Sequence, residues 1–383
     1  MRATAAPARL ALGTATTEAE LFGLAGQWDD LVRSTPRPSP FLLHPWLVEW
    51  WRHYGEGGEL AIHLARREGR LVGALPLCVR RERRLRVLSF LGRDPGLADL
   101  LLAEGEGSET ASALAGRAVA SGHDFAAFAG LPAESRLVEG LGPSALTLVS
   151  RSEAPVLDLS RGWEEVYGTR LSSKKRAHHR RRRRQLAELG RVKVEVARTA
   201  TELERTLEEA FRLHVLRWNG RPDGSGFTSP VGKAFNRAAI RALAPLDVPR
   251  IVLLRIDGRA VAFHYYLVLE GRMYVHRIAF DPAFGRLSPG MINTLDAIEN
   301  AAAEGATRVE FLGGAERYKV ELADHLEPLY EGLGLAGTVQ GRAAVTGRLA
   351  VIRARKRLKR SPALRRFYFE GLAPARRMLG RVA

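Results

Sequence analysis

The chain has 383 residues, of which 46% are hydrophobic and 26% are charged, a composition typical of globular proteins and not of disordered ones. No apolar run approaches the ~20 residues of a membrane-spanning helix, and the N-terminal residues lack the continuous apolar stretch of a secretory signal, so we expect a cytoplasmic protein. The single cysteine, Cys78, excludes an internal disulfide and any site with several cysteine ligands.

The net charge of +17 is concentrated in two segments. Residues 170–184 contain nine lysines and arginines and no acid, and residues 348–383 contain twelve together with one glutamate. The rest of the chain is close to neutral. The basicity therefore predicts anionic partners at two places and indicates nothing about the fold.

The first half of the chain predicts mixed α and β structure. The helical spacing of Leu21, Leu24 and Trp28 predicts a helix over residues 17–35. The further elements expected in this half are a tryptophan-rich helix from Pro45, a hairpin over residues 60–79, a helix at 108–121, and strands at 86–91, 97–102, 125–128 and 156–159.

The second half begins with a basic helix that Ser172 or Ser173 caps and that runs to about Leu189. After a strand at 191–197, a capping box of Thr201 and Glu204 opens a long helix. The elements that follow are a glycine-rich loop at 219–226, a helix at 230–243, three meander strands at 250–256, 259–269 and 272–280, a helix at 290–304 and a strand at 308–312. Each half passes from helix to hairpin, which indicates a duplicated fold.

The loop FGRLSPG, residues 284–290, lies between a predicted strand and a predicted helix. Free amides and the positive dipole end at a helix start attract anions, and an arginine adds a bidentate cation for phosphate. The loop therefore predicts a pyrophosphate cradle, with an ordinary capped turn as the alternative. The residues of this cradle are Gly285, Arg286, Leu287, Ser288, Gly290 and Met291.

The segment GGAERYK, residues 313–319, directly follows a predicted strand, where ligands bind in sheets of this kind. Lys319 can hold a carboxylate, a phosphate or a carbonyl oxygen. Tyr318 can protonate a leaving thiolate, and Glu316 can act as the base for an amine. For each of them a place in a solvated loop is the alternative.

Two histidines, His264 and His276, lie on neighbouring strands of the predicted meander. Histidine titrates near neutrality, so either can act as a general base. Packing in the core or in a pocket wall is the alternative. No set of ligands with the spacing of a metal site accompanies them, and we predict no metal.

The basic helix and the basic tail are candidates for binding anions. Lys174, Lys175 and Arg176 open the helix, which can bind nucleic acid, an acidic lipid surface or the phosphates of a bulky donor. An exposed, solvated helix is the alternative. The tail from Arg348 interleaves apolar residues with cations, as basic amphipathic helices at anionic membrane surfaces do. A helix packed on the protein is the alternative there.

Several of these stretches together resemble a known family. The segments LSSKKRAHHRRRRRQLAELG, FRLHVLRW, the meander that ends in FGRLSPG, and FLGGAERYK resemble the CelD-like, cellulose-biosynthesis-associated branch of the GNAT acyltransferases. The segment PFLLHPWLVEWWRHYG is similar to the usual opening of that branch. The branch is similar in turn to the Fem-type peptidoglycan aminoacyltransferases, whose donor is aminoacyl-tRNA.

The resemblance implies an α/β fold with mixed sheets in tandem GNAT-like domains. It implies a degenerate domain at residues 1–160, a donor-binding domain at 161–340 and a basic amphipathic tail at 341–383. Residues 286–290 would bind the donor pyrophosphate, and Tyr318 and Lys319 would line the acceptor or donor end.

The implied activity is N-acyl transfer from acetyl-CoA or another acyl-CoA to an amine, in polysaccharide or cell-envelope biosynthesis. We expect direct attack of the amine on the thioester, without a covalent enzyme intermediate. One alternative is a Fem-type transferase that uses aminoacyl-tRNA. The other is a non-catalytic accessory protein of polysaccharide assembly at the inner face of the membrane.

Overall fold

The computed structural model of the protein describes residues 9–92, 97–218 and 226–360. Two halves repeat one order of elements: a strand, helices, a three-stranded meander, a helix, a strand, a helix and a strand. In the N-terminal half these are β1 (Leu10–Ala15), α1 (Glu18–Phe22), α2 (Ala25–Ser34), α3 (His44–Tyr54), β2 (Glu59–Arg67), β3 (Arg70–Glu82), β4 (Leu85–Phe90), α4 (Ser108–Val119), β6 (Phe125–Leu131), α5 (Arg136–Leu141) and β7 (Leu146–Asp158), with a short β5 (Leu101–Leu102) before α4.

The C-terminal half repeats this order after two linking helices. The linking helices are α6 (Trp163–Arg170) and α7 (Ser173–Ala187). The repeated elements are β8 (Val192–Ala197), α8 (Ala200–Trp218), α9 (Pro230–Leu243), β9 (Pro249–Ile256), β10 (Arg259–Leu269), β11 (Arg272–Phe280), α10 (Pro289–Ala303), β12 (Arg308–Glu310), α11 (Arg317–Leu322) and β13 (His325–Gly334). A last helix, α12 (Val339–Arg360), follows β13. The expected mixed α/β fold with a repeated GNAT-like plan is confirmed.

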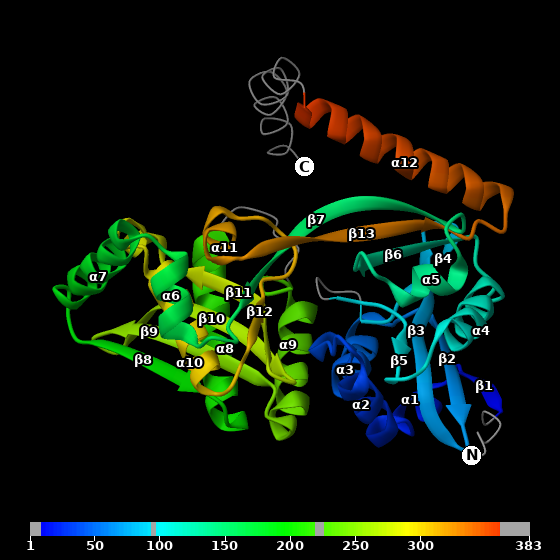
Figure 1. The fold of residues 1–383 in the computed structure, drawn as a ribbon, viewed down its shortest axis with the longest axis horizontal. Coiled ribbons are helices and arrows are strands. Elements are labelled where there is room, and N and C mark those ends of the chain that lie inside the picture. Colours follow the sequence, from blue (N-terminus) through cyan, green and yellow to red (C-terminus); the bar gives the residue numbers. More distant parts are fainter. Residues whose placement is uncertain (1–8, 93–96, 219–225, 361–383) are drawn as a thin grey trace, which may run out of the picture.

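The strands form one 13-stranded sheet in the order β1-β2-β3-β4-β6-β13-β7-β12-β11-β10-β9-β8, with β5 on β3. The long antiparallel pair β7 and β13 crosses from one half to the other (Figure 1). In the N-terminal half β13 pairs with β6, and in the C-terminal half β7 pairs with β12. Each half therefore completes its sheet with a strand from the other half.

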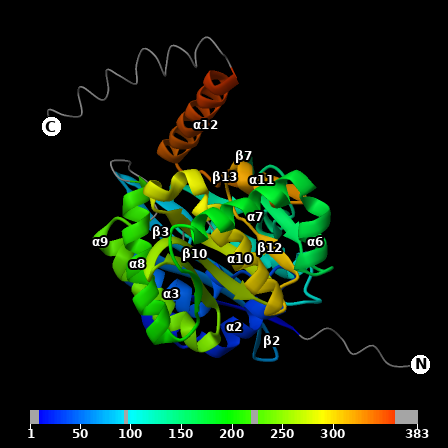
Figure 2. The same cartoon turned by 90° about the vertical axis from the view of Figure 1, so that its left-hand side faces the viewer.

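Helices cover both faces of the C-terminal part of the sheet. Side chains of α8 and α9 pack on one face together with Phe263 and Tyr265 of β10, and α10 covers the opposite face beside Tyr266. The halves meet where α3 packs against α9, with the ring of Trp46 5.0 Å from the ring of Phe235. Figure 2 views the molecule along this stack, with α12 projecting away from it.

Local chemistry explains the well-predicted elements. Both hairpin turns of the C-terminal meander have positive φ at their two central residues, 46° and 81° at Asp257 and Gly258 and 46° and 67° at Glu270 and Gly271. Such turns match the twist of the paired strands. The predicted helix at 230–243 and the three meander strands agree with α9 and β9–β11 to within a residue.

Several predicted elements differ from the structure. The expected helix at 17–35 is broken between α1 and α2, and the expected strand at 97–102 is reduced to β5. The expected strand at 156–159 is the end of β7, which starts ten residues earlier, at Leu146. The capping box of α8 is formed by Thr199 and Glu202, not by Thr201 and Glu204.

The predicted glycine-rich loop at 219–226 lies outside the described residues except for Gly226. Cys78 is buried on β3. No helix in the described ranges is both long and apolar enough to cross a bilayer.

Candidate functional site

In the C-terminal half, the segment that follows the short parallel strand β12 stays beside β7 and leaves β11, and we call the region between β11 and this segment the wedge. Strands β11 and β12 pair at three positions only, from Arg272 opposite Arg308 to Tyr274 opposite Glu310. Strand β11 continues to Phe280, and beyond Tyr274 this edge of β11 has no strand partner in the described chain. Helices α10 and α11 both begin at the carboxyl ends of these strands, where open α/β sheets bind ligands.

A β-bulge lies on β11 at the start of the wedge. Tyr265 of β10 is opposite Arg277, whereas the next residue, Tyr266, is opposite Val275. His276 is therefore the extra residue of β11. A bulge takes backbone groups out of the regular ladder and aims them elsewhere, so this part of β11 can offer a backbone amide to the wedge.

The predicted phosphate loop is more closed than the sequence suggests. It forms a short 3-10 helix over 282–287, and Ser288 then adopts a left-handed conformation with φ of 54° before α10 begins. The amide of Ser288 donates to Gly285 at 3.1 Å, and the amides of Met291 and Ile292 donate to the Ser288 carbonyl at 3.1 and 3.2 Å. Since proline has no N–H, the amide of Gly290 alone in this turn has no partner within the described chain.

Close packing against Phe280 explains why residue 290 is a glycine. A Cβ atom there would lie 2.7 Å from Cδ1 of Phe280, whereas at Gly285 the nearest atom of the same ring would be 3.6 Å away. The first distance is a clash and the second an ordinary contact. The glycine therefore lets the start of α10 approach the end of β11. Leu287 and Arg286 lie on the 3-10 helix before it.

A pocket of about 370 Å³ opens beside this loop, between α7, α10 and α11. Arg182 of α7 and Arg317 of α11 contribute guanidinium groups to it, so the cations of this pocket come from side chains. Its lining residues are His178, His179, Arg182, Ser288, Met291, Ile292, Arg317, Tyr318 and Glu321. The sequence signals in the basic helix, the loop and GGAERYK thus meet at one place, and Arg182 and Arg317 are additions that sequence reasoning missed.

Ion pairs hold the basic helix α7 at the pocket. Lys175 pairs with Glu321 of α11 at 2.8 Å, and Arg183 pairs with Asp296 of α10. Burial raises the pKa of Asp296, and Arg183 opposes that rise. These contacts fix α7 against α10 and α11, which no local sequence pattern indicates.

The three predicted anion-binding residues have different surroundings. Lys175 is engaged with Glu321, and Arg176 donates to the carbonyls of Gly168 and Leu171 at the end of α6. Lys174 is exposed and has no ion pair with a described residue. Of the three, Lys174 is therefore the residue that can meet an external anion without giving up an internal contact.

Tyr318 and Lys319 lie on α11 and not in a solvated loop, whereas Glu316 precedes the helix at its N-cap position and is 57% exposed. Lys319 is buried, and its Nζ lies 2.9 Å from Oε2 of Glu316 and 3.4 Å from the Gly313 carbonyl. Gly314 permits this fold-back, because a Cβ atom there would lie 2.8 Å from Oε1 of Glu316. Burial raises the pKa of Tyr318, which keeps its phenol protonated.

The two predicted histidines lie on opposite faces of the sheet. His264 precedes Tyr265 on β10, and consecutive strand residues point to opposite faces. His276 packs on Tyr265 at 4.9 Å between ring centroids, whereas His264 packs on Tyr266 at 5.8 Å. They therefore cannot act on one group together.

Each histidine is buried and neutral. Burial, with a smaller contribution from Lys319, lowers the pKa of His264 to about 3. Burial also lowers the pKa of His276 well below its usual range, inside a cage of Phe41, Trp46, Phe227 and Tyr265. Neither ring nitrogen of either histidine has a hydrogen-bond partner among the described residues. The geometry supports the core alternative for His276 and leaves His264 beside Lys319.

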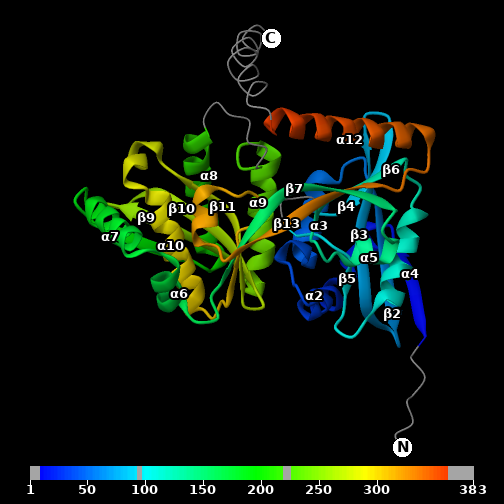
Figure 3. The ribbon, with the colours of Figure 1, turned by 45° about the horizontal axis from the view of Figure 1, so that its top comes forward.

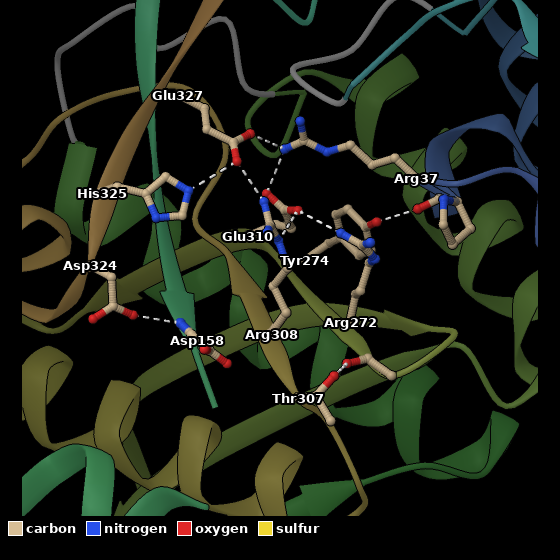
Figure 4. Close-up of polar contacts among 12 residues, drawn as sticks. Arg37, Asp158, Arg272, Tyr274, Thr307, Arg308, Glu310, Asp324, His325 and Glu327 are labelled. Carbon is tan, nitrogen blue, oxygen red and sulfur yellow. Dashed lines mark hydrogen bonds and ion pairs between the residues drawn. The ribbon is translucent and has the colours of Figure 1, made fainter. Parts of the chain in front are cut away.

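A charged cluster closes the other end of the wedge, where β11 and β12 still pair (Figure 4). Glu310 is fully buried and pairs with Arg308 at 2.8 Å and with Arg272 at 3.3 Å. Arg37 from the N-terminal half reaches the same carboxylate at 2.9 Å and Glu327 at 2.7 Å. The cluster therefore ties the N-terminal half to the closed end. Nothing in the sequence around Arg37, which lies between two prolines, predicts this contact.

Comparisons with known proteins agree with this geometry. Residues 173–320 match the family model described as the acetyltransferase (GNAT) domain. A comparison with curated protein sequences found no match. Among the described residues, no group of three or more histidine, cysteine or acidic side chains is placed to hold a metal ion.

Three solved structures resemble the whole chain in fold. FemX has a TM-score of 0.57 at 12% identity, over 80% of this chain and 94% of its own. The C-terminal domain of an Agrobacterium fabrum protein described as a lysylphosphatidylglycerol synthetase has 0.54 at 14%, over 85% and 95%. L-PGS from Bacillus licheniformis has 0.50 at 13%, over 79% and 91%. At these identities the likeness shows the fold alone.

Proposed function

We propose that the protein is an N-acyltransferase that takes an acyl group from acyl-CoA at the wedge of its C-terminal half. The observation that carries this proposal is the separation of β11 from β12 after three residue pairs, with a cationic pocket at the open end. A slot that splits a sheet suits an extended thioester arm, and guanidinium groups suit the phosphates of its carrier. Residues 173–320, the matched GNAT domain, contain the whole slot.

The pocket residues fit the phosphates of such a carrier, and arginine side chains contribute more to this fit than backbone amides do. Arg182 and Arg317 line the pocket, and the start of α10 adds the Gly290 amide and the positive end of its dipole. CoA would supply the activated thioester. Arg286, on the 3-10 helix before α10, remains a candidate for the same phosphates.

The chemical step needs polarisation of a carbonyl and removal of a proton. The amine nitrogen attacks the acyl carbon, the carbon–sulfur bond breaks, and the thiol leaves with the proton that the amine loses. We assign the backbone amide freed near His276 to the acyl oxygen, Glu316 to the proton of the amine, and Tyr318 to the leaving sulfur. Lys319 holds the Glu316 carboxylate in place through their ion pair.

The finer parts of the proposal rest on the sequence resemblance. They are acetyl-CoA as the donor, membership of the CelD-like branch, and an amine of a polysaccharide or cell-envelope precursor as the acceptor. We further propose that residues 1–160 and 161–340 are the two domains, with the donor site in the second.

Calorimetric titration of the full chain with CoA tests the central proposal. We expect saturable binding with a Kd in the micromolar to millimolar range. Acetyl-CoA added as a competitor should reduce the binding of CoA. Failure to bind CoA, acetyl-CoA and longer acyl-CoA esters at millimolar concentration would contradict it.

A second candidate donor is aminoacyl-tRNA, and one observation favours it. The pocket lies beside exposed cations of α7 that have no ion pair with a described residue, namely Lys174, Arg180, Arg181 and Arg184. Such a surface can follow a nucleic-acid backbone. Filter binding of charged tRNA at low and high salt distinguishes the donors. Salt-sensitive tRNA retention without CoA binding supports this candidate, and indifference to tRNA rejects it.

A further inference from the structure

Among the described residues, the last helix, α12, contacts the rest of the protein through its first part. Thr338 donates to Asp124 at 2.8 Å, and a Cβ atom at Gly341 would lie 1.9 Å from the Asp124 carbonyl, so the helix begins in close contact with β6. Further along, Arg348 pairs with Glu82 and lies 4.7 Å from the ring of Phe125. Figure 3 shows α12 leaving this anchor and running above the molecule.

The apolar stripe of α12 is used in this attachment. Val345, Leu349 and Ile352 are half-buried, whereas Ala350, Val351 and residues 353–357 are exposed. The alternative of a helix packed on the protein therefore holds for its first part. The last described turns project from the surface.

The projecting turns carry positive charges that no described acidic residue neutralises. Arg353, Arg355, Lys356 and Arg357 are exposed, and none of them has an ion pair with a described residue. The sequence of α12 contains no acid. Four cations in five residues repel one another, and an external anion would relieve this repulsion.

We propose that α12 binds the protein to an anionic membrane surface through these four cations. A cluster of four to eight lysines and arginines on a helix binds anionic lipid with about 1 kcal/mol per cation. The 22 residues of α12 give a rigid arm of about 33 Å at 1.5 Å per residue. Val351, which is 51% exposed among the arginines, can enter the headgroup region.

A lipid surface suits α12 better than a nucleic acid does. Proteins that hold single strands combine cations with aromatic side chains on which bases stack, and α12 carries no aromatic residue. This inference does not depend on the proposed acyl transfer, because the arm begins on the N-terminal half.

Co-sedimentation of the full chain with vesicles tests the inference. Vesicles contain about 30% phosphatidylglycerol in phosphatidylcholine, or phosphatidylcholine alone, at about 0.1 M and about 0.5 M salt. We expect binding to the anionic vesicles only, and its loss at the higher salt. The variant R353Q/R355Q/K356Q/R357Q should bind at least about a hundred-fold more weakly.

The matched control removes the same charge from the opposite end of the molecule. K174Q/R180Q/R181Q/R184Q loses four exposed cations of α7 and should bind vesicles as the wild type does. Equal melting temperatures of the variants exclude misfolding as the cause. Equal loss in both variants, equal binding to neutral vesicles, or no vesicle binding by the wild type would overturn the proposal. Binding of an RNA homopolymer that only the α12 variant loses would assign the arm to nucleic acid instead.

Discussion

The two halves of the protein share one order of elements but differ at the wedge between their parallel strands. In the N-terminal half β4 and β6 pair at two positions, Val87 opposite Phe125 and Leu88 opposite Ala126. Beyond them Phe90 and Phe128 lie 5.1 Å apart between ring centroids. The same wedge topology is therefore filled with side chains here.

The segment that follows β4 adds further apolar side chains to this region. Leu97 and Leu100 are buried, and the amide of Ala98 donates to the carbonyl of Gly130 at the end of β6 at 3.3 Å. In the C-terminal half the corresponding segment folds instead into the 3-10 helix and the start of α10. Apolar residues therefore occupy the region beyond the paired positions in the N-terminal half, whereas in the C-terminal half a pocket opens beside the start of α10.

The charged residues that line the cavities also differ between the two halves. A cavity of about 910 Å³ lies at the matching end of the N-terminal half, and its lining includes six acidic and two basic side chains. An anionic carrier would be repelled there and attracted to Arg182 and Arg317. The comparison of the two copies therefore supports the C-terminal copy as the proposed donor site, because geometry and charge both differ between the copies. The lining residues with charge are Arg37, Asp99, Glu104, Glu106, Glu134, Arg136, Glu139 and Glu327.

The largest expected effect is the loss of donor binding on removal of the pocket cations. We expect R182Q/R317Q to weaken CoA binding by about a hundred-fold, since hydrogen bonds to charged groups contribute ~1.5–3 kcal/mol each. Binding of pantetheine, which lacks the phosphates of CoA, should not change. Calorimetry measures both, with R180Q/R181Q as the control on the same helix. Unchanged CoA affinity would show that other residues hold the phosphates.

Breaking the contact between the halves should have the next largest effect. Arg37→Gln removes two carboxylate partners at once, and Glu310, which is fully buried, keeps only Arg272 and Arg308. We expect a loss of about 1–3 kcal/mol in the free energy of unfolding, measured by urea denaturation. Arg33→Gln, at a pair that is about 40% exposed, should have little effect. Equal losses in the two variants would refute a special role for the cluster.

A pair of glycine substitutions separates packing from ligand binding at the start of α10. Gly290→Ala should cost about 1–3 kcal/mol, because the added methyl meets the Phe280 ring at 2.7 Å. Gly285→Ala meets the same ring at 3.6 Å and should be near neutral. Thermal unfolding measures both. If Gly290→Ala keeps its stability and loses CoA affinity, the glycine serves the ligand and not the packing.

The smallest expected effect concerns the buried histidines of the two halves. The pKa of His264 falls from 6.5 to about 3 on burial, so the unfolded chain binds a proton that the folded chain does not between these values. The contribution of neutral His264 to the free energy of unfolding is therefore fully present above pH 6.5. It decreases as the pH falls, by about 1 kcal/mol between pH 6.5 and 5.5. His264→Gln should flatten this slope in a melting series.

His63 in the N-terminal half gives the comparison. Burial, with Arg117 nearby, lowers its pKa to about 4, so His63→Gln should flatten the acid slope in the same direction over a narrower range. An unaltered slope in His264→Gln would mean that His264 takes up its proton in the folded state as well.

Local sequence signals predicted most of the elements of the C-terminal half. Hairpin turns with glycine, the Ser172 cap of α7 and the proline at the start of α9 depend on residues a few positions apart. The missed elements depend on distant partners. Strand β1 is held by β2, and β13 lies between β6 and β7, so neither carries a strong pattern of its own.

The candidate site was predicted in pieces. The loop at 284–290, the segment at 313–319 and the basic helix were each singled out, and the structure brings them to one pocket. The roles of individual residues were harder to predict from the sequence. Gly290 serves packing, Lys175 and Arg176 serve internal contacts, and the two histidines face opposite sides.

By itself the sequence determined the fold class, the duplicated plan, the meander and the location of the two positive segments, because periodicity, turn chemistry and charge are local properties. Only the tertiary structure decided how the segments after the parallel strands pack in each copy and which cations meet at the pocket beside α10. Those outcomes depend on whether a segment such as 97–100 packs between two strands, and on ion pairs between residues more than a hundred positions apart, such as Lys175 and Glu321.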